Sequence, residues 1–129
     1  IDMFHGYTYS GHPLAAAAAC ATIDLYRDEG LFQRAAELEP YFGAAVHSLK
    51  GVRHVADIRN VGLAAAIDLD PIEGAPGKRG FETMKTMFFD KDVMFRVSGD
   101  TLAFSPPLIA EKSHVDEMFG RLAEALAAA

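Results

Sequence analysis

Two pairs of short apolar runs, each joined by a turn that contains glycine, place the strongest constraint on how this chain folds. The predicted strands span residues 52–59, 63–69, 94–97 and 101–104. The first pair is connected through Asn60-Val61-Gly62 and the second through Ser98-Gly99-Asp100. Short strands joined by tight turns pair in the antiparallel direction. The sequence therefore predicts a small antiparallel sheet.

Helical patterns lie before, between and after these strands. The predicted helices span residues 11–29, 31–50, 78–89 and the last segment of the chain. Gly30 is a typical stop for the first helix, and Pro40 is expected to kink or restart the second. Helices and hairpins in separate blocks indicate an α+β fold with the helices packed on one face of the sheet.

Apolar residues at three- and four-residue steps predict which helix faces are buried. In residues 78–89, Phe81, Met84, Lys85 and Phe88 indicate only that a short helix forms. The last helix carries Val115, Met118, Phe119, Leu122 and Leu126, and either Ser113 or Glu111 could cap it.

Composition excludes several classes of protein. Half of the 129 residues are hydrophobic, which suits a folded domain with a core. The net charge of −6 argues against a nucleic-acid surface, and the scattered Lys and Arg residues argue against an anionic membrane surface. With no secretory leader and no apolar run long enough to span a bilayer, we expect a cytoplasmic protein. Because the sequence starts at Ile1 within a motif, we expect it to be part of a longer polypeptide.

The segment just before the first helix is rich in hydroxyl groups. Thr8 and Ser10 precede Pro13, which suits a first helical turn. Free N–H groups at a helix start, together with the helix dipole, favour an anion such as phosphate. The alternative role for Thr8 is that of an ordinary N-cap, which the residue type also favours.

Arg96 is the second candidate binding residue. It follows the apolar run Val93-Met94-Phe95 and precedes Gly99-Asp100. One interpretation is a local ion pair with Asp100 across the turn. The other is recognition of a ligand carboxylate, which a guanidinium group can bind through two parallel hydrogen bonds.

Four blocks of sequence carry a resemblance to a known family. They are Gly6-Tyr7-Thr8-Tyr9-Ser10-Gly11-His12-Pro13, Asp57-Ile58-Arg59-Asn60-Val61-Gly62-Leu63, Phe95-Arg96-Val97-Ser98-Gly99-Asp100, and Pro106-Pro107-Leu108-Ile109 followed by Val115-Asp116-Glu117-Met118. In order and spacing the chain resembles the last third of class III (omega) aminotransferases, and within them the omega-amino acid (beta-alanine)–pyruvate branch.

The resemblance implies a fold, a cofactor and binding roles. It implies the C-terminal small domain of a fold type I enzyme that uses pyridoxal 5'-phosphate. Residues 1–30 would form a phosphate-binding loop and a helix leading to a large domain, and residues 31–129 the small domain. In such enzymes the Thr at position 8, with the backbone around Tyr7, binds the cofactor phosphate of the other subunit of a homodimer or higher oligomer. The Arg at position 96 binds a substrate carboxylate.

The implied reaction moves an amino group from an omega-amino acid or amine to a 2-oxo acid such as pyruvate. It needs a Schiff-base lysine and an acidic partner, which in the family precede the Thr8 motif. The lysines present have ordinary polar neighbours: Lys50, Lys78, Lys85, Lys91 and Lys112. We therefore expect no catalytic residue here and an inactive fragment. No metal site is expected, because the histidines lack companion ligands at metal spacing.

Other functions are compatible with the same residues. One is an aminomutase or a decarboxylating aminotransferase of the same fold. Another is a non-catalytic α+β module that binds a carboxylate or mediates oligomerisation.

Overall fold

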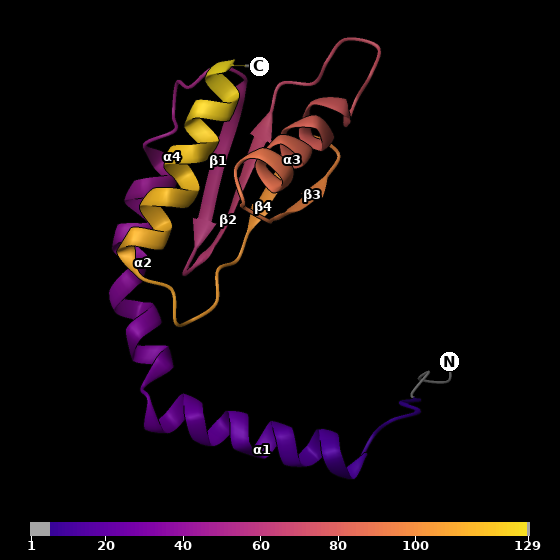
Figure 1. Ribbon diagram of the computed structural model, residues 1–129, viewed down its shortest axis with the longest axis vertical. Coiled ribbons are helices and arrows are strands. Elements are labelled where there is room, and N and C mark those ends of the chain that lie inside the picture. The colour runs from indigo at the N-terminus through magenta and orange to yellow at the C-terminus, as the bar shows by residue number, and fades with distance from the viewer. Residues whose placement is uncertain (1–5, 129) are drawn as a thin grey trace, which may run out of the picture. The chain divides into compact units, whose positions relative to one another are not determined.

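The computed structural model describes residues 6–128, and within them the chain forms two compact units. The first unit ends at Phe32 and the second begins at Gln33. The elements are α1 (Pro13–Asp28), α2 (Leu31–His47), β1 (Val55–Val61), β2 (Ala64–Leu69), α3 (Lys78–Asp90), β3 (Arg96–Ser98), β4 (Thr101–Phe104) and α4 (Lys112–Ala128), as Figure 1 shows. The predicted α+β fold, a small antiparallel sheet with helices, is confirmed.

The sheet has the strand order β1-β2-β4-β3, and all of its pairs are antiparallel. β1 runs two residues further than predicted, so that Val61 pairs with Ala64. The first hairpin turn is therefore Gly62-Leu63, with Gly62 at φ 55°, and Asn60 and Val61 belong to the strand. The second turn is Gly99-Asp100, since Ser98 pairs with Thr101.

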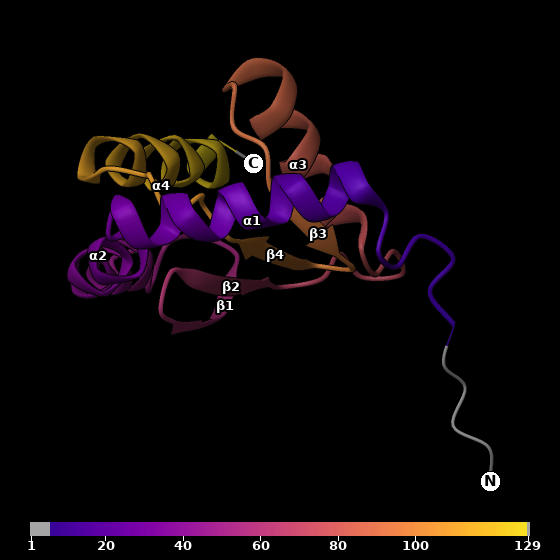
Figure 2. The same ribbon diagram turned by 90° about the horizontal axis from the view of Figure 1, so that it is seen from below.

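One face of the sheet is covered by helices and forms the core. The strands contribute alternate residues to this face, among them Ala65, Ile67 and Leu69 of β2. The helices contribute apolar side chains that pack in the same cluster: Phe42 and Val46 from α2, Met87 from α3, and Val115, Phe119, Leu122 and Leu126 from α4. Figure 2 shows α3 and α4 on the same side of the sheet. The opposite face of the sheet, called here the open face, carries the other alternate residues.

The buried face of α4 matches the sequence prediction, except that Met118 is only half-buried. Glu111 occupies the capping position, since its carbonyl accepts the first helical hydrogen bond from the Val115 N–H. The Glu111 N–H in turn donates to Nδ1 of His114, at 3.1 Å. The His114 side chain thus accepts a hydrogen bond from the residue that precedes its own helix, which is one half of a capping box.

α2 runs through Pro40 as one helix, so of the two expectations for Pro40, a kink or a restart, the restart is wrong. In α3 the buried residues are Gly80, Thr83 and Met87, whereas Phe81 and Phe88 are exposed. The predicted helix is present, but the residues that indicated it are mostly not the ones that it buries, because Gly80 faces the sheet and a residue without a side chain gives no apolar signal.

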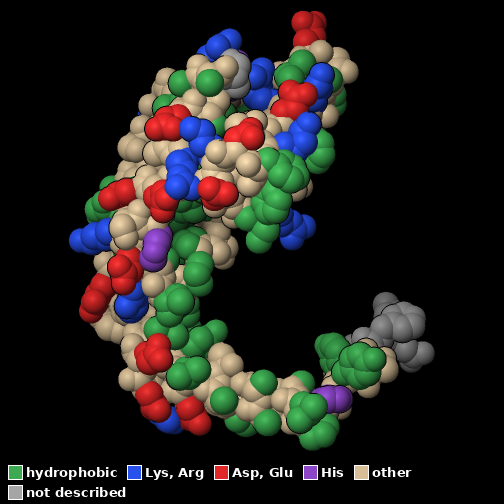
Figure 3. Space-filling view, in the orientation of Figure 1, with side chains coloured by type: hydrophobic (Ala, Val, Ile, Leu, Met, Phe, Trp, Pro, Cys, Tyr) green, Lys and Arg blue, Asp and Glu red, His purple; other side chains and the backbone are tan. Residues whose placement is uncertain are grey.

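The first unit is built differently. α1 has no buried residue, and its large apolar side chains Leu14, Ile23 and Leu25 are all more than half exposed. Hydrophobic side chains are visible along α1 in Figure 3. As predicted, Gly30 follows the helix with a positive φ of 60°.

Candidate functional site

Arg96 lies on the open face of the sheet, on the edge strand β3. Its register partner on β4 is Ala103. Ala66 of β2 pairs with Ala103 on one side and with Arg59 of β1 on the other. Because directly paired residues point to the same face, one row across the sheet reads Arg96, Ala103, Ala66, Arg59. Two arginines therefore stand at the two edges of the sheet, with methyl groups between them.

A hollow of about 460 Å³ covers this row. Its lining includes both arginines of the row, the alanines between them, and residues at the ends of β1 and β4: Arg59, Asn60, Val61, Ala64, Ala65, Ala66, Arg96, Ala103, Phe104 and Ser105. The volume is in the range of small-molecule sites. Small side chains at the centre leave space above the sheet, so the hollow combines an apolar floor with a cation at each side.

The two arginines differ in their partners. Arg59 donates to both carboxylate oxygens of Asp68, at 2.5 Å and 3.2 Å, and approaches Asp57 at 3.4 Å. Thr101 adds a hydrogen bond to Asp68, at 2.7 Å. These hydrogen bonds, that of Arg59 foremost, hold the pKa of Asp68 below its ordinary value, and the Asp68 carboxylate raises the pKa of Arg59. Arg59 is thus neutralised within the sheet.

Arg96 is exposed, and its side chain makes no ion pair or hydrogen bond with any of residues 6–128. The alternative of a local pair with Asp100 is wrong, because both Asp100 oxygens are engaged elsewhere. The Gly77 N–H donates to Oδ2 at 2.6 Å, and the Gly80 N–H donates to Oδ1 at 2.9 Å. Asp100 thus caps the start of α3, an arrangement called here the Asp100 cap. The guanidinium group of Arg96 remains available to an anion that enters the hollow.

Thr8 lies in the first unit, four residues before the residue that caps α1. The Ser10 N–H donates to the Tyr7 carbonyl at 3.0 Å, which closes a turn with Thr8 near its tip. Thr8 is exposed, and so is Tyr7. The N-cap of α1 is His12, whose Nδ1 accepts the Ala15 N–H at 3.4 Å. The N-cap alternative for Thr8 is therefore wrong, and its hydroxyl group lies on an exposed turn.

The helix start offers fewer free donors than the sequence suggested. Pro13 has no N–H group, and the Ala15 N–H is directed at His12. Among the described residues of the first turn, this leaves the Leu14 N–H without a hydrogen-bond partner. An anion at this end of α1 would therefore depend on the turn that carries Thr8 more than on the helix itself. The capping role of His12 was missed because histidine is not among the preferred N-cap residues.

The lysines of the described part of the chain are exposed or paired with a carboxylate. Four of the five are exposed: Lys50, Lys78, Lys85 and Lys112. The fifth, Lys91, donates to Glu124 at 2.7 Å. In the described part of the chain, no lysine points into the hollow beside Arg96. Over the same residues, no group of three or more His, Cys, Asp and Glu residues is placed to bind a metal ion.

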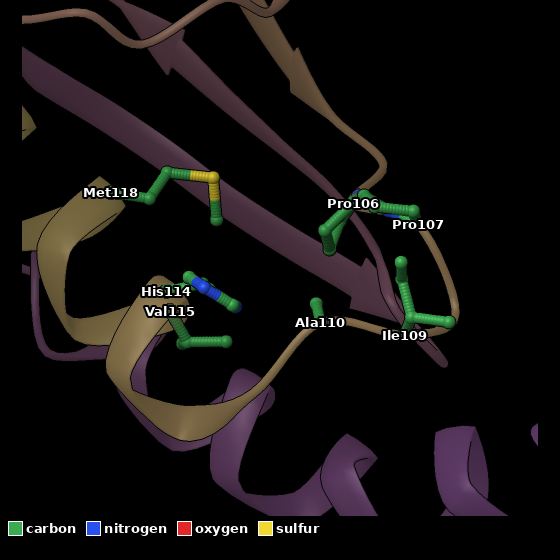
Figure 4. Close-up of a pocket in the computed structure, with 7 residues that line it drawn as sticks. All are labelled: Pro106, Pro107, Ile109, Ala110, His114, Val115 and Met118. Atoms are coloured by element: carbon green, nitrogen blue, oxygen red, sulfur yellow. The ribbon is translucent and has the colours of Figure 1, made fainter.

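A second hollow of about 300 Å³ lies where the loop after β4 meets α4. Figure 4 shows its lining, Pro106, Pro107, Ile109, Ala110, His114, Val115 and Met118, with the α4 side chains facing the proline-containing loop. The lining is almost entirely apolar and contains no arginine or lysine. It lacks the cation that carboxylate recognition needs, so the hollow beside Arg96 is the better candidate site. None of the helices in residues 6–128 is both long and apolar enough to cross a membrane.

Comparison with known proteins identifies the family. The sequence signature described as aminotransferase class III matches residues 2–126. The chain belongs to the class III aminotransferases. It is 55% identical over 118 residues to an omega-aminotransferase of Caulobacter vibrioides, covering 92% of this chain and 27% of that protein. It is 41% identical over 126 residues to a beta-alanine–pyruvate aminotransferase of Pseudomonas aeruginosa, covering 98% of this chain and 28% of that protein. The chain thus spans just over a quarter of the length of these relatives.

Solved structures give the same result for the fold. A transaminase structure with L-alanine aligns with a TM-score of 0.86 at 32% identity, over 95% of this chain and 30% of that one. An adenosylmethionine-8-amino-7-oxononanoate aminotransferase from Methanocaldococcus jannaschii aligns with a TM-score of 0.85 at 25% identity, over 99% of this chain and 30% of that one. The resemblance drawn from the four sequence blocks is confirmed at the level of the family and the fold. Class III aminotransferases use pyridoxal 5'-phosphate.

Proposed function

We propose that these residues form the C-terminal part of an aminotransferase that moves an amino group from an omega-amino acid or amine to a 2-oxo acid such as pyruvate. The observation that carries the proposal is Arg96, an unpaired guanidinium group beside an apolar hollow in a class III aminotransferase fold. The relatives named for omega-amino acid and beta-alanine transfer support this substrate class. An omega-amino acid and a 2-oxo acid each carry a carboxylate, which Arg96 would bind.

Pairing distinguishes Arg96 from Arg59 as the substrate residue. A cation that already has two carboxylate neighbours gains little from a third. Arg96 can form two parallel hydrogen bonds to a carboxylate, and the methyl groups of Ala103 and Ala66 leave room for a short carbon chain beside it. Because its side chain is exposed rather than buried, it can also turn away when a substrate lacks a carboxylate, without leaving a buried unpaired charge.

Tyr7 and Thr8 would bind the phosphate group of pyridoxal 5'-phosphate. Their turn fits such a group because it presents the exposed Thr8 hydroxyl and lies close in sequence to the free Leu14 N–H. When bound, the cofactor accepts the amino group and draws electrons from the carbon that carried it. This chain would bind and orient the cofactor and the substrate. The Thr8 hydroxyl group would donate a hydrogen bond to a phosphate oxygen, and Arg96 would fix the carboxylate end of the substrate.

These roles assign two segments of the chain to different parts of the enzyme. Residues 1–30 would form the phosphate-binding loop and a helix that leads to a large domain, and residues 31–129 the small domain. Residues 1–5 of this division lie outside the described part of the structure. The whole enzyme would act in the cytoplasm as a homodimer or higher oligomer, in which Thr8 serves the cofactor of the neighbouring subunit. The remainder of the enzyme would supply the Schiff-base lysine.

The test of the proposal is Arg96→Ala in the full-length enzyme. The variant lacks the guanidinium group that would bind the substrate carboxylate. Its catalytic efficiency toward beta-alanine and pyruvate is expected to fall, by an amount equivalent to on the order of 2–5 kcal/mol in transition-state free energy. Turnover of an amine donor that has no carboxylate should fall far less in its own half-reaction. Single-turnover measurements of the two half-reactions separate these effects.

Arg53→Ala is the matched control, since Arg53 is also exposed and has no ion pair with the described residues. It should leave both half-reactions unchanged. Equal losses with carboxylated and uncarboxylated donors in Arg96→Ala would contradict the substrate role of Arg96. A full-length enzyme that transfers no amino group from any omega-amino acid or amine would contradict the proposed function as a whole.

A further inference from the structure

The strand that carries Arg96 has few attachments of its own. β3 consists of three residues and, among residues 6–128, pairs only with β4, so no strand of that part of the chain lies on its outer edge. Next to it, the ring of Phe95 packs on Phe104 with 4.6 Å between ring centroids, and Val97 is half-buried against the core. Arg96 itself points to the open face, away from both contacts. Such a short edge strand is a weak support for a side chain that has to meet a ligand at a defined place.

The Asp100 cap ties this strand to α3. The Gly77 and Gly80 N–H groups both donate to Asp100, at 2.6 Å and 2.9 Å. Both groups belong to the start of α3, where a helix has free donors and the positive end of its dipole. No acidic residue lies in the first turn of α3 itself, and Gly77 provides no side-chain cap. The carboxylate that the helix start requires therefore comes from the hairpin turn, two residues after Ser98 at the end of β3.

Close contact between backbones reinforces this connection. A Cβ atom on Gly80 would clash with the Gly99 carbonyl oxygen and would lie 2.9 Å from Cα of Asp100 and from Cγ2 of Val97. Gly77, at φ 81°, has room for a Cβ only at 3.4 Å from Cα of Gly99. The turn and the start of α3 thus pack with no space between them. Movement of one requires movement of the other, and Arg96 lies three residues before Gly99.

We propose that Asp100 is a positioning residue for Arg96: by capping α3 from within the β3–β4 turn, it fixes the strand from which Arg96 reaches a substrate carboxylate. The proposal rests on the proposed function in that it takes Arg96 as the carboxylate-binding residue. Asp100 touches no substrate. Its effect is transmitted through the backbone of residues 96–100, which the Asp100 cap anchors to a helix that is itself packed in the core through Met87.

Asp100→Asn in the full-length enzyme is the main test. The amide can accept only one of the two N–H bonds, so the turn should loosen while side-chain size is kept. We expect the KM for beta-alanine to rise about 5–30-fold, in keeping with the effect of misplacing a binding group by a fraction of an ångström to an ångström. The kcat/KM for an amine donor without a carboxylate should change less than about twofold. Hydrogen exchange of the Gly77 and Gly80 amides should accelerate.

A second measurement is independent of catalysis. Calorimetric binding of propionate, a carboxylate without an amino group, should weaken in Asp100→Asn by about the same factor as the KM rises. In an Arg96→Ala background the same substitution should have no further effect on propionate, because the two residues act through one contact. Asp116→Asn is the matched control: it removes a carboxylate that accepts a hydrogen bond from Tyr41 at 2.5 Å, and it should change neither measurement.

Several outcomes would overturn the proposal. One is an equal loss with carboxylated and uncarboxylated donors, which would give Asp100 a purely structural role. Another is unchanged propionate affinity in Asp100→Asn while Arg96→Ala abolishes binding. If Asp100→Asn does not fold, Gly77→Ala, which strains a positive φ at the same cap, replaces it with the same expected direction. If transfer activity is missing altogether, the proposed function fails, and the propionate series still decides the role of Asp100.

Discussion

Two of the three long helices, α1 and α4, are nearly equal in length, 16 and 17 residues, yet they differ completely in burial. α4 buries Val115, Phe119, Leu122 and Leu126 in the core of the second unit. α1 buries no residue, although Leu14, Ile23 and Leu25 are as apolar as the buried residues of α4. An apolar residue contributes to stability only when it has a surface to pack on. The difference between the helices is therefore one of partners and not of composition.

This comparison predicts that the two units respond differently to the same substitution. Leu122→Ala removes a fully buried side chain from α4 and should lower the free energy of unfolding of the 129-residue chain by about 2–5 kcal/mol. Leu25→Ala removes a side chain that is 53% exposed in α1, and should change it by less than about 0.5 kcal/mol. Urea unfolding followed by circular dichroism measures both. Similar losses for the two variants would show that α1 is packed after all.

A second prediction concerns cofactor binding by Thr8 in the first unit, which should not depend on the stability of that unit. Thr8→Ala in the full-length enzyme should weaken cofactor retention by about 1.5–3 kcal/mol, the value of one hydrogen bond to a charged acceptor. Because Thr8 lies on an exposed turn and is not the N-cap of α1, unfolding should be unchanged. Dissociation of the cofactor can be followed by its absorbance after dilution. An unchanged dissociation rate would remove Thr8 from the phosphate site.

The smallest predicted effect concerns the ion pairs of the two units and depends on pH. Hydrogen bonds from Arg59 and Thr101 lower the pKa of Asp68 in the folded chain below the ordinary value of 3.8. The stability that Asp68 contributes is therefore complete above pH 3.8 and is lost as the pH falls through the lowered pKa. For this partly exposed pair we expect about 0.5–1 kcal/mol, measured as the difference between wild type and Asp68→Asn near neutral pH.

That difference should shrink as the pH is lowered below about 3.8, since protonation then removes the same charge from the wild type. The control is Asp24→Asn in α1, which breaks an exposed ion pair with Arg27 at 3.0 Å. It should have no measurable effect at any pH. A difference for Asp68→Asn that stays constant down to the acid unfolding transition would mean that Asp68 acts by shape and not by charge.

Much of the second unit could be predicted from its sequence. The apolar spacing of α4 indicates one buried face, and the turn residues of the two hairpins indicate antiparallel pairing; the structure shows both. These patterns work because a long element with many apolar positions averages over single exceptions. The end of β1 and the first hairpin turn were less well predicted, since Val61 fits a strand and a turn equally well in sequence, and only its pairing with Ala64 assigns it to the strand.

The contacts that matter most for the candidate site could not be predicted in this way. Gly80 is buried because a neighbouring backbone occupies the space of its missing side chain, and hydrophobicity carries no information about such a contact. A pair between Asp100 and Arg96, its near neighbour in sequence, was one of two interpretations, but Asp100 caps a helix that begins more than twenty residues earlier. Arg96 could be singled out by residue type and by resemblance, whereas its lack of a partner needed the structure.

The open face of the sheet has one consequence for how such a chain can change its ligand. Ala66 and Ala103 line the hollow beside Arg96 from the face opposite the core. A larger residue at either position would narrow the hollow without meeting Ile67 or Leu102, which point to the other side. The shape of the ligand that fits and the stability of the fold thus depend on different residues of the same strands. Because side chains alternate between the two faces along β2 and β4, selection can alter the ligand that fits while leaving folding stability nearly unchanged.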